Sequence, residues 1–410
     1  MHIRLAESFQ QRTDRDELAS ILRACVHCGF CNATCPTYLQ TGNELEGPRG
    51  RIYLMKQVLE GQTVSQVTRQ HLDSCLNCRS CETTCPSGVR YGRLLDTTSV
   101  IVEGAADNRR FSTQLLRRAI TTVFPYSQRF SVLLDMARLF KPLLPKNLAA
   151  KIPTKPQRHT WPDLHHARKM LVLKGCVQNQ LAPQIDYACA TVFDKLGISL
   201  IAAPYSGCCG ALSYHLSQHQ QALTLAKQNI DACWPLIEQG AEAILITSSG
   251  CGVMVKDYGY LLRDDFAYAD KAARFAALVK DPAEVLVNED LSILANADNH
   301  CRIAFQSPCT LQHGQKLSGL VESLLRKVGY QLVNVTDEHL CCGSAGAYSL
   351  LNPKMANRLR EQKWQALTVN QPSLVATANI GCLSHLQSAS GQKIVHWLEL
   401  LAALTHPVAE

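Results

Sequence analysis

The chain has 410 residues, 46% of them hydrophobic and 18% charged, and a formal net charge of +7. This composition is that of an ordinary globular protein with a sizeable core, and the length suggests two or three domains. No run of about eighteen apolar residues occurs and the N-terminus has no apolar stretch, which argues against a membrane-spanning helix and a signal peptide. We therefore expect a cytoplasmic protein whose nineteen cysteines stay reduced and free to bind metal.

Residues 1–110 are expected to form a mostly helical domain. Apolar residues recur at helical spacing from Gly50 to Glu60, and we also expect helices from Asp14 to Ala24 and from Val64 to Cys75. Two cysteine-rich loops follow the first and the last of these helices along the chain. The forty-residue gap from Cys35 to Cys75 is longer than a compact small ferredoxin needs, so the pattern favours an α-helical ferredoxin domain.

Both loops have the pattern Cys-x2-Cys-x2-Cys-x3-Cys-Pro, with Pro36 and Pro86 expected to end them. This is the spacing of proteins with two [4Fe–4S] clusters, in which three thiolates of one tight turn are joined by a fourth from the other motif. Zinc sites or disulfides are the alternative, but zinc sites usually pair two Cys-x2-4-Cys knuckles and do not need the third and fourth cysteines. The predicted ligands are Cys25, Cys28, Cys31 and Cys85 for one cluster, and Cys75, Cys78, Cys81 and Cys35 for the other.

Residues 111–165 are expected to be a basic helical segment followed by a Pro-rich linker. Between residues 109 and 169, only Asp135 and Asp163 are acidic, against thirteen basic residues. The basic residues are Arg109, Arg110, Arg117, Arg118, Arg129, Arg138, Lys141, Lys146, Lys151, Lys155, Arg158, Arg168 and Lys169.

This basic segment alternates with apolar residues, which fits an anionic membrane surface or a partner protein better than nucleic acid. We expect Phe124 to Lys155 to include an in-plane helix that presents Phe130, Leu133, Leu134 and Phe140 to the membrane. Docking on a partner protein is the alternative for the same segment.

The second half contains an internal repeat, with a first module over 166–290 and a second over 291–410. The 32-residue spacing between Cys176 and Cys208 recurs between Cys309 and Cys341, and both copies continue with Cys-Cys-Gly and close with Gly-Cys. Each copy is predicted to be strand, helix, strand, helix, strand, which gives a parallel sheet with helical crossovers. The fold class is therefore an α-helical ferredoxin domain followed by an α/β domain of two repeated Cys-Cys-Gly modules.

The repeated cysteines follow the carboxyl ends of apolar strands, where open α/β sheets place their ligand crevice. We expect further metal or redox sites there, although buried cysteines are also common core residues. Cys189, Cys233 and Cys301 fit that core role. The candidate sites are Cys176, Cys208, Cys209 and Cys251 in the first module, and Cys309, Cys341, Cys342 and Cys382 in the second.

Four histidines lie near these cysteines, namely His215, His313, His339 and His385. A histidine can bind metal or tune a cluster by hydrogen bonding, although a satisfied or surface histidine is the alternative for each. We single out His313 as the candidate.

Several stretches together give the chain a family resemblance over nearly its whole length. They run from Ile21 to Cys31, from Gly47 to Tyr53, from Cys81 to Tyr91 and from Leu340 to Gly346. With two cluster motifs and two Cys-Cys-Gly modules in this order, the chain resembles the iron–sulfur subunit of bacterial glycolate oxidase (glycolate dehydrogenase). The fullest Cys-Cys-Gly modules close with Cys-x2-Cys, whereas this chain has Ser248 and Asn379 at the first of those positions.

The resemblance implies that a flavin-bearing partner subunit with FAD oxidises glycolate to glyoxylate, and that this chain passes the electrons towards membrane quinone. It implies a cytoplasmic location, peripheral on the inner membrane. The chain itself has no Gly-x-Gly-x2-Gly after a strand, so we expect substrate oxidation elsewhere and no catalytic residue in this chain. Because its basic segment alternates with apolar residues, we expect no nucleic-acid partner. The alternatives are a lactate-utilisation or anaerobic glycerol-3-phosphate dehydrogenase complex, which have similar modules, and a metal-stabilised, non-enzymatic binding module.

Overall fold

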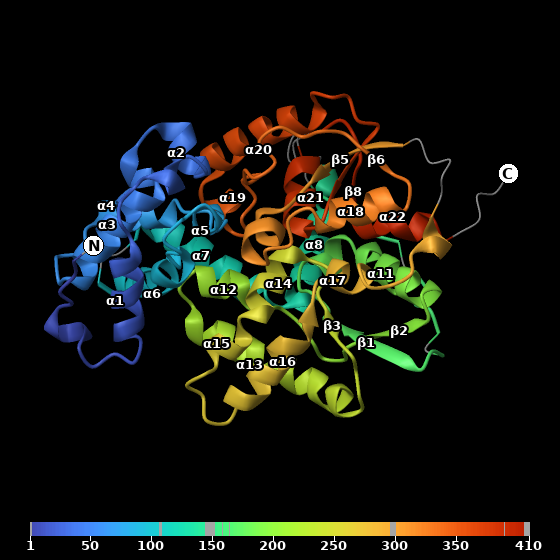
Figure 1. Cartoon of the computed structure of the whole chain (residues 1–410), viewed down its shortest axis with the longest axis horizontal. Coiled ribbons are helices and arrows are strands. Elements are labelled where there is room, and N and C mark those ends of the chain that lie inside the picture. Colours follow the sequence, from blue (N-terminus) through green and yellow to red (C-terminus); the bar gives the residue numbers. More distant parts are fainter. Residues whose placement is uncertain are drawn as a thin grey trace.

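The computed structural model describes residues 2–105, 109–143, 152–157, 159–163, 165–295, 301–388 and 390–405. The N-terminal part is helical and lies to one side of two α/β modules, which lie one above the other (Figure 1). Its core includes Leu22, Met55, Leu59 and Leu94, which are fully buried. Its helices are α1 (Arg15–Ala24), α2 (Pro36–Thr41), α3 (Pro48–Leu59), α4 (Gln66–Asp73), α5 (Ser80–Thr83) and α6 (Tyr91–Ala105), with short 3-10 turns η1 (Glu7–Phe9), η2 (Phe30–Asn32) and η3 (Glu44–Glu46).

The expected helices of this region occur as α1, α3 and α4, with ends that differ by one or two residues. Pro36 ends the ligand loop, as expected, but it does so by starting a helix, because it is the first residue of α2. Proline suits this position because the first helical residue needs no N–H donor and proline already has a helical φ.

The first module is a four-stranded parallel sheet in the order β2-β1-β3-β4. Its strands are β1 (Arg168–Val172), β2 (Ile198–Ala202), β3 (Ile244–Leu245) and β4 (Val279–Lys280). Its helices are α10 (Gln178–Leu181), α11 (Gln184–Lys195), α12 (Ala211–His215), α13 (His219–Glu238), α14 (Ser249–Lys256), α15 (Tyr258–Leu261), α16 (Ala269–Leu278) and α17 (Pro282–Leu286), followed by the 3-10 turn η5 (Ser292–Leu294).

The second module repeats this topology with the order β6-β5-β7-β8, again all parallel. Its strands are β5 (Arg302–Gln306), β6 (Gln331–Leu332), β7 (Leu374–Thr377) and β8 (Ile394–His396). Its helices are the π-helical turn η6 (Thr310–Gly314), α18 (Leu320–Lys327), α19 (Tyr348–Leu351), α20 (Pro353–Thr368), α21 (Ile380–Gln387) and α22 (Trp397–Ala403).

The predicted parallel sheets with helical crossovers are therefore present, with one more strand in each module than expected. The extra strands β4 and β8 have only two and three residues, too few to leave a periodic signal in the sequence. The modules share one hydrophobic core, which contains Val172 and Phe193 of the first and Phe305 and Trp397 of the second. Since α11 also packs against α22, the two modules form one α/β body.

Helices α7 (Phe111–Val123) and α8 (Ser127–Leu139) lead to the 3-10 turn η4 (Lys141–Leu143), and none of residues 152–157 and 159–163 is in a helix or strand. The expectation that Phe130 faces a membrane is wrong. Its side chain is 5% exposed, and its ring lies 5.0 Å from that of Phe124, because α8 packs against the body of the protein on this face. Leu144, Pro145, Lys146, Lys151 and Arg158 of the predicted basic segment and linker lie outside the described residues.

Polar contacts fix the helical part on both modules. Arg79 and Arg93 donate to Asp257 of the first module at 3.2 and 2.7 Å. Thr83 is 2.9 Å from His313 of the second. In the described residues, no helix is both long and apolar enough to cross a membrane.

Candidate metal centres

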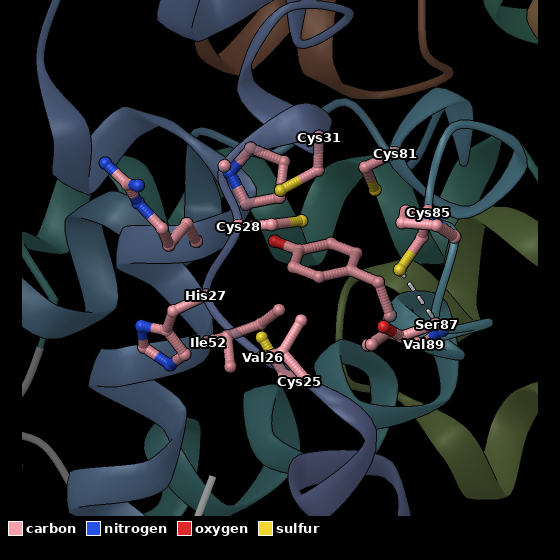
Figure 2. Close-up of a pocket in the computed structure, with 15 residues that line it drawn as sticks. Cys25, Val26, His27, Cys28, Cys31, Ile52, Cys81, Cys85, Ser87 and Val89 are labelled. Carbon is pink, nitrogen blue, oxygen red and sulfur yellow. Dashed lines mark hydrogen bonds between the residues drawn. The ribbon is translucent and has the colours of Figure 1, made fainter.

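The four cysteines predicted for the first cluster lie around one cavity. Cys25, Cys28 and Cys31 come from the loop after α1, and Cys85 comes from the opposite loop after α5 (Figure 2). Cys81 lines this cavity as well, but its own electrostatic neighbours are Cys78, Cys75 and Cys35. Desolvation, together with the nearby Cys25, Cys28 and Cys85, raises the pKa of Cys31 to about 11.

A second cavity gathers the other set, with Cys75, Cys78 and Cys81 from the loop before α6 and Cys35 from the end of the first loop. Burial raises the pKa of Cys75, Cys78 and Cys81, which favours the protonated thiols. Metal binding would displace those protons, as thiolate ligation requires. The structure thus brings together both predicted sets of four, each with one cysteine from the opposite motif.

The two loops have the same backbone shape. His27 and Gly29 in the first have φ values of 57° and 86°, and Asn77 and Arg79 in the second have 52° and 58°. Left-handed residues at alternate positions turn successive N–H groups inward, which makes a concave site for an anion. The N–H groups of His27 and Asn77 accordingly donate to the sulfurs of Cys25 and Cys75. Both loops therefore fit an anionic, thiolate-ligated group.

A buried arginine supports the second cavity. Arg51 is 1% exposed and donates to Glu46 at 2.8 Å and to the carbonyl oxygen of His71 at 2.7 Å. The positive charge of Arg51 lowers the pKa of Cys75, against the larger effect of burial. The hydroxyl of Tyr91 lies 3.7 Å from the sulfur of Cys75. The sequence pattern did not single out Arg51, although this residue lies in the Gly47 to Tyr53 stretch that carries part of the family resemblance.

In the first module, the repeated cysteines also form a set of four. Cys176 follows β1, Cys208 and Cys209 follow β2, and Cys251 lies in the first turn of α14 after β3. The thiol of Cys208 is in hydrogen-bonding contact with Cys176 and Cys209, and Cys209 is in contact with Cys251. Parallel strands bring these residues together because their carboxyl ends share one edge of the sheet.

The second module has the same arrangement. The sulfurs of Cys309 and Cys341 are 3.8 Å apart, and those of Cys342 and Cys382 are 3.3 Å apart. Gly343, with φ of 87°, donates its N–H to the sulfur of Cys341 at 3.4 Å. A Cβ atom at this position would lie 2.6 Å from the carbonyl oxygen of Ala356, so the residue after the cysteine pair must be glycine.

The positions where fuller modules have a fifth cysteine carry polar side chains here. Ser248 hydrogen-bonds Cys251 and lowers its pKa, against the larger effects that raise it. The Asn379 side chain accepts from the N–H groups of Gly381 and Cys382 at 2.7 and 3.4 Å. Each module therefore offers four cysteine sulfurs and one polar residue that orders the fourth.

The second cavity lies beside the second module. Leu76, Cys309, Cys341 and Tyr348 form one buried cluster, against which Cys78 packs. The two modules also touch close to their cysteines in the chain, since the hydroxyls of Ser249, two residues before Cys251, and Thr310, next to Cys309, are 2.8 Å apart. The second cysteine set of the helical domain thus lies beside that of the second module.

The histidines near these sets make other contacts. His313 places Nδ1 2.9 Å from the Thr83 hydroxyl and Nε2 3.1 Å from the carbonyl oxygen of His339, so both ring nitrogens join the helical domain to the second module. His385 is 3.2 Å from the carbonyl oxygen of Ala356, and His215 is 3.6 Å from the Asp96 carboxylate. Cys189 and Cys233 are fully buried in the core, and Cys301 packs against it.

The comparisons with known proteins follow this division of the chain. Residues 21–89 match the family model of the 4Fe-4S dicluster domain, and residues 170–256 and 303–387 each match that of the cysteine-rich domain. The chain is 49% identical to the glycolate oxidase iron-sulfur subunit of Escherichia coli (strain K12), over 98% of this chain and 98% of that protein. The chain belongs to the family of glycolate oxidase iron–sulfur subunits. It is therefore an iron–sulfur protein with a role in electron transfer.

Two further relatives and one solved structure are more distantly similar to this chain. The probable glycolate oxidase iron-sulfur subunit of Bacillus subtilis (strain 168) is 28% identical over 97% of this chain and 96% of that protein. Lactate utilization protein A of the same organism is 22% identical over 57% of this chain and 98% of that protein. A crystal structure of a hypothetical protein from Helicobacter pylori shares the fold, with a TM-score of 0.57 and 9% identity over 98% of this chain and 74% of that chain.

Proposed function

We propose that this chain is the electron-transfer subunit of a complex in which a flavoprotein partner oxidises glycolate to glyoxylate. The observation that carries the proposal is the 49% identity to a glycolate oxidase iron-sulfur subunit over 98% of both chains, with all sixteen motif cysteines gathered in sets of four. Iron–sulfur clusters supply one-electron chemistry when bound, which complements a flavin that collects two electrons from its substrate.

We propose Cys25, Cys28, Cys31 and Cys85 as the ligands of one [4Fe–4S] cluster and Cys75, Cys78, Cys81 and Cys35 as those of the other. The convergence of each set on one cavity supports this assignment. The inward N–H groups of both loops and the Arg51 cation favour the thiolate forms of these side chains.

We extend the proposal to the modules. Cys176, Cys208, Cys209 and Cys251 would hold one further centre, and Cys309, Cys341, Cys342 and Cys382 another. Their support is the sulfur contacts in both modules and the absence of any disulfide among the described cysteines. Four sulfurs from three strand ends are the donor set that an iron–sulfur centre needs.

The first cavity is the proposed face towards the flavoprotein. Cys28 is exposed, and the neighbouring Val26 and Phe30 are 66% and 61% exposed. Large apolar side chains beside an accessible ligand suit the buried centre of a protein interface.

Anaerobic addition of glycolate to the purified complex tests the proposed function. We expect glycolate to bleach the visible iron–sulfur absorbance, provided that the flavoprotein is present. Bleaching by lactate or glycerol-3-phosphate, with none by glycolate, would assign the chain to one of the alternative complexes. A colourless protein that contains zinc would favour the non-enzymatic binding module.

We also propose that helices α7 and α8 bring the chain to an anionic membrane surface, near quinone. The outer face of α8 carries Val132, Leu133, Met136 and Leu139, with Phe140 directly after the helix, and all five are between 47% and 74% exposed. Arg117 of the basic segment is turned to the body of the protein, where it donates to the carbonyl oxygen of Leu216 at 3.1 Å. The apolar side chains, and not the whole basic set, are therefore the proposed contact.

Flotation of the intact chain with vesicles that contain anionic lipid tests this surface. We expect the variant with Leu133, Met136 and Leu139 all changed to Ser to float less than wild type, while Arg117→Gln changes flotation little. If the triple variant floats as wild type does but no longer co-purifies with the flavoprotein, the surface is a protein interface.

A further inference from the structure

A lysine is buried beside the cysteines of the second module. Lys363 of α20 is 3% exposed, and its Nζ donates to the carbonyl oxygens of Asp337 and Glu338, both at 2.9 Å. No carboxylate among the described residues forms an ion pair with it. Burial of an ammonium group without a counter-charge is costly, so another negative group must stabilise it.

The cysteines of the module are close to this lysine: its two carbonyl acceptors come three and four residues before Cys341, and Ala356 and Leu359 of the same helix pack in one buried cluster with Cys309 and Cys341. Burial lowers the pKa of the Lys363 amine, whereas the charges of Cys342, Cys341, Cys382 and Cys309 raise it. Conversely, the lysine charge lowers the pKa of Cys309 and Cys382, where burial and cysteine contacts are the larger effects. The thiolates of a metal-bound set would therefore supply the counter-charge that the lysine lacks.

The first module has a neutral residue at the corresponding position. Gly210 approaches the carbonyl oxygen of Ala222 as Gly343 approaches that of Ala356, which aligns the two helices. Seven residues further along, Asn229 stands where the second module has Lys363. The Asn229 side chain donates to the carbonyl oxygen of Cys208 at 2.8 Å and to the Tyr258 hydroxyl at 3.1 Å.

The first module also contains a buried acid. Asp186 accepts hydrogen bonds from Gln178 at 2.8 Å and Thr247 at 2.6 Å, and its charge raises the pKa of Cys251. The two modules thus share one scaffold and one cysteine arrangement but differ in charge. A cation lies beside the second set, and an amide and a carboxyl group lie beside the first.

We propose that Lys363 is a positioning residue that raises the reduction potential of a centre bound by Cys309, Cys341, Cys342 and Cys382 above that of the first module. Reduction adds one electron to the centre and makes it one unit more negative, which a fixed neighbouring cation favours. The electron comes from the helical domain, whose Cys78 packs beside this set, and Lys363 keeps its proton. The inference rests on the proposed function, since it requires that the second module binds an iron–sulfur centre.

The test is a redox titration of the full chain, followed by electron paramagnetic resonance, with iron measured in every sample. Lys363→Asn copies the first module, Asn229→Lys makes the reverse change, and Lys363→Arg keeps the charge. We expect Lys363→Asn to retain its iron. The equilibrium constant for reduction of one centre should fall at least tenfold, which lowers its reduction potential by about 59 mV for one electron. Lys363→Arg should shift that centre by less, and Asn229→Lys should raise the potential of a different centre.

Three outcomes would overturn the proposal. If Lys363→Asn keeps its iron and no potential moves, Lys363 does not tune a centre, while the electron-transfer function stands. If Lys363→Asn does not fold, an unchanged set of potentials in Asn229→Lys decides against the proposal. If Cys341→Ala has as much iron as wild type, the second module holds no centre, and this part of the proposed function fails with it.

Discussion

The helical domain and the α/β modules both gather cysteines in fours, but by opposite routes. In the helical domain, two loops of the same shape exchange their last cysteine, so each set depends on both loops. In the modules, each set comes from three strand ends of a single sheet. Damage to one loop should therefore reach both cavities of the helical domain, whereas each module should lose its own set alone.

The exchange of cysteines predicts the largest effects. Cys85→Ser should remove the same magnetic resonance signal as Cys28→Ser, because both line the first cavity, and Cys78→Ser should remove the other signal. Each variant should also lose folding stability, since a bound cluster holds the loops as a structural metal does. A spectrum of Cys85→Ser that matches that of Cys78→Ser would mean that each motif binds its own cluster.

Because each module supplies all four cysteines of its set, a substitution there should cause a smaller loss of iron, confined to that module. Cys208→Ala should lower the iron content by at most one centre, because Cys208 contacts only cysteines of the first module. Both signals of the helical domain should remain at wild-type intensity. Loss of either signal in this variant would show that the first module and the helical domain are coupled and that the module does not hold its cysteine set independently.

The buried arginine of the second cavity offers a test with a matched control. Arg51→Met removes the guanidinium partner of Glu46, which keeps its contact with His71 at 2.7 Å, and should cost about 3–5 kcal/mol, as does loss of one partner from a buried pair. Arg49→Met breaks the nearby pair with Glu44, which is more than a third exposed, and should cost about 1 kcal/mol or less. Chemical denaturation of the anaerobic protein measures both, and equal losses would contradict a special role for Arg51.

The two modules should also respond to pH in opposite directions. Asp281 and His396 both cap the helix after the fourth strand of their module, and both are buried. Burial raises the pKa of Asp281 to about 7 and lowers that of His396 to about 3. The Asp281 contribution is thus fully present below the unfolded pKa of about 4 and is lost as the pH rises to 7, whereas the His396 contribution is present above about 6.5 and is lost as the pH falls.

Asparagine can replace either capping residue, because its side chain also caps helices but does not titrate. The stability of Asp281→Asn relative to wild type, followed by its thermal midpoint, should rise by about 2 kcal/mol between pH 5.5 and pH 8. The thermal midpoint of His396→Asn, compared with that of wild type, should instead rise as the pH falls from 8 to 5.5. Asp290→Asn is the control, because Asp290 is exposed and a hydrogen bond from Ser292 lowers its pKa. Equal pH profiles for the two cap variants would show that these groups are not buried as described.

The sequence predicted the helical start, the parallel modules and the grouping of cysteines because regular spacing encodes these features. The repeat from Cys176 to Cys251 and from Cys309 to Cys382 is visible in the printed chain. Strands of two or three residues such as β4 and β8 have no such periodicity, and the burial of Phe130 depends on which face of α8 meets the body of the protein. The domain boundaries at 110, 165 and 290 stay predictions.

Lys363 and Arg51 were missed because each is a charged residue whose role depends on tertiary neighbours. The sequence does contain a signal for Lys363. At helical spacing it lies on the same face of α20 as the apolar residues Ala356, Leu359 and Leu367, where a buried side chain is expected. The hydrogen bonds that occupy both nitrogens of His313 had no counterpart in the sequence pattern.

The iron and sulfide content of the chain, isolated without oxygen, tests the central claim most directly. The claim is that all four cysteine sets bind iron–sulfur centres, two shared between loops and two closed within modules. It predicts more than about eight iron atoms per chain, and a fall to about eight when Cys208 and Cys341 are both changed to Ala. A wild-type chain that already holds only about eight would contradict the claim and leave the module cysteines as structural or thiol-redox groups.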